Sequence, residues 1–174
     1  SSAASDVYKR QVVTADHETG GIALGTGKYA LNLKALENQK ASAEVLSKKI
    51  SDLRKAKNNH VAWEDIKNLL SEEMGFWSVL PITWEQEKKL HDEYEKSFVR
   101  NKVEFSESMY AKTEPMAAKA KEVMDQIAMV GWTSGGHSAG YVPVFAIGAG
   151  SDLFIGKMDN TEIPKRIAKA GGYK

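Results

Sequence analysis

The sequence predicts an α/β protein that is interrupted by a long helical segment. Residues 12–21 (VVTADHETGG) and 131–140 (GWTSGGHSAG) each begin as a β-prone run and then break into a glycine-rich loop that carries a histidine. Between them, apolar residues recur at helical spacing. Because open α/β sheets bind ligands beyond the carboxyl ends of their strands, chemistry is expected in these two loops.

The composition is that of a globular domain. The chain has 174 residues, of which 42% are hydrophobic and 27% are charged. Its net charge is +1 and no basic cluster stands out, so no nucleic-acid partner is expected. No apolar stretch approaches the ~20 residues of a membrane helix, so no membrane span is expected. The chain has no cysteine, which excludes disulfides and thiolate-bound zinc.

Residues 1–11 are polar and resemble a non-native leader or artefact, so they are kept apart from the fold. A buried strand usually carries ~4–8 apolar residues. Only Val12 and Val13 precede the first loop. The sequence is therefore expected to begin in mid-strand, with native sequence missing upstream.

Residues 12–33 and 131–174 form the predicted α/β portion. After the first loop, residues 22–24 predict a strand, and Tyr29, Leu31 and Leu33 alternate with a period of two that predicts another.

After the second loop, a strand is expected over 142–147, where Pro143 indicates an edge strand or a strand start. Thr161 is expected to cap a last helix that stops at Gly171 and Gly172.

Residues 34–130 predict a mainly helical insertion with four apolar stripes. Gly75 is expected to end the second helix, and Thr83 with Gln86 predicts a capping box for the third. Thr113 is expected to cap the fourth helix, with Pro115 in its first turn. The stripes are Leu36, Ala43, Leu46, Ile50 and Leu53; Trp63, Ile66, Leu70 and Met74; Leu90, Tyr94 and Phe98; and Met116, Ala120, Val123, Ile127 and Val130.

Asp16 and His17 in the first loop and His137 in the second are residues of the metal-ligand type. A carboxylate oxygen and an imidazole nitrogen both suit Zn²⁺. Neighbours in a strand point to opposite faces, so Asp16 and His17 can converge only where the chain bends, and Gly20 and Gly21 permit a bend. Taken alone, either loop is more often a turn with a hydrogen-bonded histidine than a metal site.

Together, the two loops closely resemble the alkaline phosphatase family. The resemblance rests on TADHETGG at 14–21 and on WTSGGH at 132–137 followed by a strand with Pro143. Residues 158–163 (MDNTEI) also resemble the entrance to that family's C-terminal helix. The resemblance implies the C-terminal part of a three-layer α/β/α sandwich, with the helical segment as a variable insertion.

The resemblance also implies roles for the three candidate ligands. Asp16 and His17 would bind one of two zinc ions ~4 Å apart, and His137 would bind the other. A Mg²⁺ ion would lie nearby. The family's nucleophilic serine, phosphate-binding arginine, magnesium ligands and remaining zinc ligands have no match in this chain and are expected upstream.

The other polar residues near the loops or among the helices are given ordinary roles. Ser134 and Ser138 are interpreted as loop serines, and Glu18 as a solvated loop residue in preference to a hydrogen-bond acceptor behind the metal ligands. His60 and His91 are interpreted as surface residues.

The sequence thus predicts the C-terminal portion of a secreted or periplasmic alkaline phosphatase. The parent would hydrolyse small phosphate monoesters through a phosphoserine intermediate, and the resemblance allows a homodimer. This chain alone is expected to be inactive. Two alternatives stay open: a related two-zinc phosphodiesterase or sulfatase-type hydrolase, and a non-catalytic metal-binding or interaction module.

Overall fold

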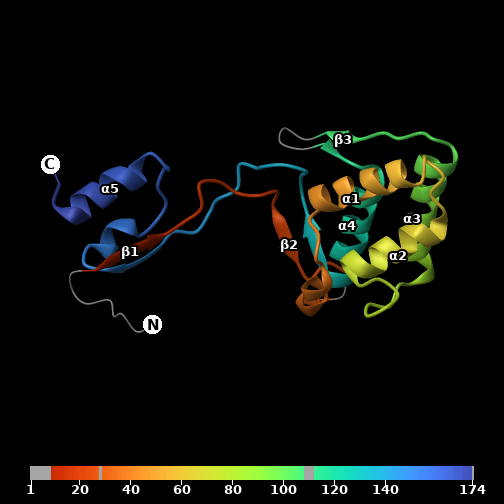
Figure 1. Ribbon diagram of the computed structural model, residues 1–174. Helices are drawn as coiled ribbons and strands as arrows, with labels where there is room; N and C mark the ends of the chain where they lie inside the picture. Colours follow the sequence, from red (N-terminus) through yellow and green to blue (C-terminus); the bar gives the residue numbers. More distant parts are fainter. Residues whose placement is uncertain (1–8, 28, 108–111, 174) are drawn as a thin grey trace. The chain divides into compact units, whose positions relative to one another are not determined.

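The computed structural model describes residues 9–27, 29–107 and 112–173 (Figure 1). The chain divides into two compact units. The terminal unit comprises the residues up to Gly21 and those from His137 onward, and the helical unit comprises Ile22–Gly136. Residues 1–8 of the predicted leader lie outside the described residues, whereas Arg10 and Gln11 belong to the first strand.

Among its described residues, the terminal unit contains one strand pair and one α-helix. Strand β1 (Arg10–Val13) pairs antiparallel with β6 (Phe145–Gly148), from Arg10 opposite Gly148 to Val13 opposite Phe145. Strand β6 begins later than position 142, after Pro143, which has no N–H to donate to a ladder. A 3₁₀ turn (Ser151–Phe154) and helix α5 (Glu162–Gly171) follow.

Helix α5 ends as predicted, because Gly172 adopts a left-handed conformation with φ of 72°. Its start differs from the prediction. Thr161 occupies the N-cap position but makes no capping bond through its side chain. Instead, the Thr161 N–H and Oγ1 both donate to Asp159 Oδ1, at 2.9 and 2.7 Å.

Four α-helices dominate the helical unit, and Figure 1 shows them packed together. They are α1 (Ala43–Ala56), α2 (Trp63–Met74), α3 (Trp84–Tyr94) and α4 (Pro115–Ala128). A 3₁₀ helix (Leu33–Asn38) precedes α1, and a π-helix (Glu95–Val99) continues α3. Two antiparallel pairs complete the unit: β2 (Ile22–Leu24) with β5 (Val130–Trp132), and β3 (Ser106–Glu107) with β4 (Lys112–Thr113). Within the described residues, no helix is long and apolar enough to cross a membrane.

The predicted stripes form the core of the helical unit. Two residues of the first stripe are exceptions, because Leu36 is exposed in the 3₁₀ helix and Ala43, the first residue of α1, is only half-buried. Val130 of the fourth stripe is buried but lies in β5, since α4 ends at Ala128. The buried stripe residues that lie in helices are Leu46, Ile50, Ile66, Leu70, Met74, Leu90, Tyr94, Phe98, Met116, Ala120 and Val123.

Two helix-end signals in the sequence are confirmed. Thr83 Oγ1 accepts from Gln86 N at 3.3 Å while Gln86 Oε1 accepts from Thr83 N at 3.0 Å, which is the reciprocal capping box. Gly75 ends α2 with φ of 71°, a left-handed conformation that glycine adopts without steric cost.

The strand predicted from the alternation of Tyr29, Leu31 and Leu33 is absent from the structure. Tyr29 has φ of 52°, and Leu33 already begins the 3₁₀ helix. Between them, the Asn32 backbone N–H and side-chain amide donate to Ala128 O and Ile127 O, both at 3.2 Å. The segment is therefore bonded to the end of α4 and has no strand partner, although its residues alternate.

The π-helix places Phe98 against the buried Tyr94 ring and the largely buried Arg54 guanidinium. The Phe98 ring stacks on Tyr94, with centroids 5.5 Å apart and an interplanar angle of 18°. On Phe98 also lies the Arg54 guanidinium, whose Cζ is 3.6 Å from the ring centroid. Such a contact between a cation and an aromatic face is favourable, and more so when water is excluded.

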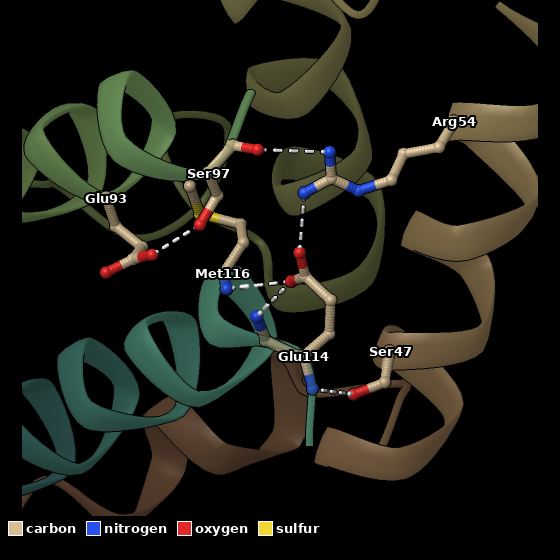
Figure 2. A network of polar contacts seen from close by, with 7 residues as sticks. Ser47, Arg54, Glu93, Ser97, Glu114 and Met116 are labelled. Carbon is tan, nitrogen blue, oxygen red and sulfur yellow. Dashed lines mark hydrogen bonds and ion pairs between the residues drawn. The ribbon is translucent and has the colours of Figure 1, made fainter. Parts of the chain in front are cut away.

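Glu114, and not Thr113, caps α4. Thr113 lies in β4, whereas the Glu114 carboxylate accepts from the N–H groups of Met116 at 2.7 Å and Ala117 at 3.3 Å. The same carboxylate pairs with Arg54 Nη2 at 2.9 Å (Figure 2). Glu114 is 2% exposed, and the Arg54 side chain is 15% exposed.

Further hydrogen bonds surround this ion pair and provide partners for the polar groups next to it. Figure 2 shows Arg54 Nη1 donating to Ser97 O at 3.2 Å and Ser97 Oγ donating to Glu93 at 2.5 Å. The Glu114 N–H donates to Ser47 Oγ at 3.0 Å. The network thus joins α1, α3, the π-helix and the start of α4.

We predict that Glu114→Ala lowers the free energy of unfolding of the helical unit by about 3–5 kcal/mol, because it leaves the largely buried Arg54 charge without its partner. Glu114→Gln should cost less, since the amide oxygen still accepts a bond at the helix start. Urea unfolding followed by tryptophan fluorescence measures this, because all four tryptophans (Trp63, Trp77, Trp84 and Trp132) lie in the helical unit.

The matched control is Glu44→Ala, which removes an exposed carboxylate from the first turn of α1. It should change stability by no more than about 0.5 kcal/mol. Equal unfolding midpoints for Glu44→Ala and Glu114→Ala would contradict a stabilising role for the buried pair.

Candidate metal centre

The two candidate loops meet because of the β1–β6 pairing. Val13, the last residue of β1, lies opposite Phe145, the first residue of β6. The chain that leaves β1 and the chain that enters β6 are therefore at the same end of the ladder. Asp16 and His17 follow β1, and His137 precedes β6, so the pairing brings these loops together.

His17 and His137 lie in contact. Their ring centroids are 3.6 Å apart and their planes are tilted by 45°. Both Nδ1 atoms face the main-chain oxygen of Glu18, at 2.9 Å from His17 and 3.1 Å from His137. A carbonyl oxygen can only accept, so each Nδ1 carries a hydrogen. In a neutral ring of that tautomer the lone pair is on Nε2, the atom that would bind a metal.

Asp16 lies on the Nε2 side of His17. Its Oδ2 is 3.3 Å from His17 Nε2, and its Oδ1 accepts from the His17 backbone N–H at 3.0 Å. The Asp16 side chain is 85% exposed and that of His17 is 43% exposed. Two ligands of a tetrahedral zinc, each about 2.0–2.1 Å from the ion, lie about 3.3 Å apart. This carboxylate and this imidazole therefore fit one zinc ion.

His137 does not complete that site. Within the described residues, no three or more His, Asp or Glu side chains gather closely enough to hold a metal ion. Asp16, His17 and His137 thus have the right chemistry for zinc, and they are one fewer than the four ligands of a tetrahedral site.

Glu18 is more than a solvated loop residue, which corrects the interpretation from the sequence. One oxygen of its carboxylate accepts from the Ser138 N–H at 2.9 Å and from the Ser138 hydroxyl, and the other accepts from the Gly21 N–H. The Ser138 hydroxyl, followed by the Gly21 N–H, lowers the pKa of Glu18 to about 2. The carboxylate is therefore ionised at neutral and alkaline pH.

The remaining candidate residues lie elsewhere or have local partners. His60 is exposed in the helical unit, and its Nδ1 lies 2.9 Å from Asn58 O. His91 is partly buried against the rings of Trp63 and Tyr94. Ser134 Oγ donates to Gly136 O at 2.7 Å within its own loop.

The sequence matches the alkaline phosphatase family over residues 3–173. Because this match spans nearly the whole chain, the chain belongs to the alkaline phosphatase family. The match begins within residues 1–11, and the non-native origin of that segment stays a prediction.

Two proteins of Bacillus subtilis (strain 168) are similar in sequence. Alkaline phosphatase 3 is 30% identical over 182 residues, which cover 98% of this chain and 32% of that protein. Alkaline phosphatase 4 is 24% identical over 168 residues, which cover 96% of this chain and 30% of that protein. The chain therefore spans about a third of the length of these relatives.

A solved structure has the same fold. The cold-active alkaline phosphatase from a psychrophilic Shewanella sp. is similar with a TM-score of 0.60 and 24% identity, over 92% of this chain and 33% of that one. At this identity the likeness shows the fold alone, and it confirms the predicted alkaline-phosphatase-like α/β class. To that fold, the described residues contribute two-stranded antiparallel ladders.

We predict that neutral His137 carries its proton on Nδ1 in the metal-free 174-residue chain, because that nitrogen faces the Glu18 carbonyl oxygen. Two-bond ¹⁵N–¹H correlation spectra at a pH where the rings are neutral distinguish the tautomers. His60 is the internal reference, since its Nδ1 faces the Asn58 carbonyl in the same manner. Protonation of the neutral His137 ring at Nε2 would contradict the orientation described above.

Proposed function

We propose that this chain is the C-terminal portion of a metal-dependent alkaline phosphatase that hydrolyses phosphate monoesters through a phosphoserine intermediate. The observation that carries the proposal is the meeting of Asp16, His17 and His137 at one end of the β1–β6 ladder. Membership of the family and 30% identity to Alkaline phosphatase 3 support the monoesterase over a related diesterase or sulfatase.

In this proposal Asp16 and His17 hold one zinc ion, and His137 holds the second. When bound, the two ions would supply Lewis-acid activation of the serine nucleophile and of the departing oxygen. This chain's residues orient the ligands: the Glu18 carbonyl sets the tautomer of both rings, and the Asp16 carboxylate lies beside His17 Nε2.

Other parts of the active site are proposed to lie outside this chain. They include the nucleophilic serine, the phosphate-binding arginine, most magnesium ligands and the remaining zinc ligands. Residues 34–130 are proposed to be an insertion into the α/β portion at 12–33 and 131–174. We also propose that the parent protein is periplasmic or secreted and that it forms a homodimer.

We predict that His17→Ala and His137→Ala each abolish hydrolysis of p-nitrophenyl phosphate by the full-length protein supplied with Zn²⁺ and Mg²⁺. Loss of one imidazole ligand should also lower the zinc content, which atomic absorption measures. The control is His60→Ala, which removes an exposed histidine of the helical unit and should leave both readings unchanged. Full activity in the His17 and His137 variants would show that these loops are structural.

We also predict that the 174-residue chain alone has negligible phosphatase activity in the same assay, even with both metals, because it supplies three of the ligands and no matched nucleophile. Addition of metal should not restore turnover. Substantial hydrolysis by pure chain, free of host phosphatase, would contradict the assignment of the nucleophile to sequence outside it.

A further inference from the structure

We infer that Glu18 is a positioning residue for the metal centre. Its carboxylate fastens the loop of His137 to the loop of Asp16 and His17, and its main-chain oxygen orients both imidazoles. The inference rests on the proposed function, because the rings that Glu18 positions are the proposed zinc ligands.

The main-chain part of this role uses a single oxygen. The Glu18 carbonyl oxygen has two lone pairs and can accept two hydrogen bonds. It lies 2.9 Å from His17 Nδ1 and 3.1 Å from His137 Nδ1. Metal-binding histidines almost always donate their other ring N–H to a carboxylate, a carbonyl or water. Here one carbonyl serves two histidines, its chain neighbour His17 and His137, which is 119 residues away from Glu18.

The side-chain part fixes the distance between the loops. Ser138 follows His137 directly, and both its N–H and its hydroxyl donate to Glu18 Oε2. The other carboxylate oxygen accepts from Gly21 N, which closes the first loop on itself. A carboxylate can accept all three bonds, whereas a glutamine amide has one accepting oxygen and an NH₂ group that only donates.

Gly140 leaves the space that the Glu18 side chain fills. A Cβ at position 140 would lie 2.9 Å from Glu18 Cγ and 3.3 Å from Ser138 Oγ, so an alanine would displace Glu18 from its partners. Gly140→Ala therefore disturbs the same contact as Glu18→Gln without changing the charge.

The test measures zinc affinity of the full-length protein by competition with a chromophoric chelator. Glu18→Gln should bind zinc about 10–100-fold more weakly than wild type. Ser138→Ala should weaken binding less, because its N–H still donates to Glu18. Gly140→Ala should weaken binding in the same direction. The matched control is Glu162→Gln, an equal change at an exposed carboxylate of α5 that should leave affinity unchanged.

Two further measurements distinguish a role of Glu18 in positioning the metal ligands from a role in overall stability. The visible spectrum of Co²⁺ placed in the site should change in Glu18→Gln, because its ligands are held differently. Thermal unfolding of the metal-free protein should be nearly the same for wild type and Glu18→Gln. The double variant Glu18→Gln/Ser138→Ala should bind zinc no more weakly than Glu18→Gln, since both changes remove one shared contact.

Wild-type zinc affinity and an unchanged cobalt spectrum in Glu18→Gln would overturn the inference. Equal losses of zinc affinity and metal-free stability would overturn it too, because they indicate a structural role. If Glu18→Gln does not fold, the zinc affinity, cobalt spectrum and metal-free stability of Ser138→Ala and Gly140→Ala test the inference in its place. Failure of the proposed function has another signature: zinc affinity would then be unaffected by His17→Ala and His137→Ala.

Discussion

Backbone pairing between β1 and β6 determines where the candidate metal centre lies. The two strands are antiparallel, so the end of β1 at Val13 faces the start of β6 at Phe145. Loops that are distant in sequence are thereby brought to one place by a ladder of four residues on each side. The side-chain contacts of Glu18 then hold loops that the backbone has already placed together.

The first and last strands of the helical unit pair with each other, so the distance between its two ends does not depend on its length. Its first residues pair with its last ones, from Ile22 opposite Trp132 to Leu24 opposite Val130. Its apolar core and the Arg54–Glu114 pair lie entirely within Ile22–Gly136. A unit that closes on itself in this manner can vary in length without changing the separation of the two points where it joins the chain.

The features predicted correctly from the sequence are those with local causes. Helical stripes, the Thr83 capping box and the Gly75 stop depend on residues a few positions apart. The irregular conformation of residues 29–33 could not be predicted from the local sequence, because Asn32 is held by hydrogen bonds to the end of α4, almost a hundred positions later. The three candidate ligands were recognisable from motifs, but the contact between Glu18 and Ser138 was not, since the two residues are 120 positions apart.

The π-helix at Glu95–Val99 has a consequence for how this protein can vary. A π-turn contains one residue more than the α-helical turn it replaces, and each residue of an α-helix turns the chain by about 100°. Loss of a single residue from this turn would restore regular α-helix and shorten the spacing of Tyr94 and Phe98 from four residues to three, which still places both rings on neighbouring positions of one helix face. A one-residue deletion between Glu95 and Val99 can therefore be absorbed as a change of helix type, whereas the same deletion within α1 or α4 would turn every later residue of that helix by about 100°.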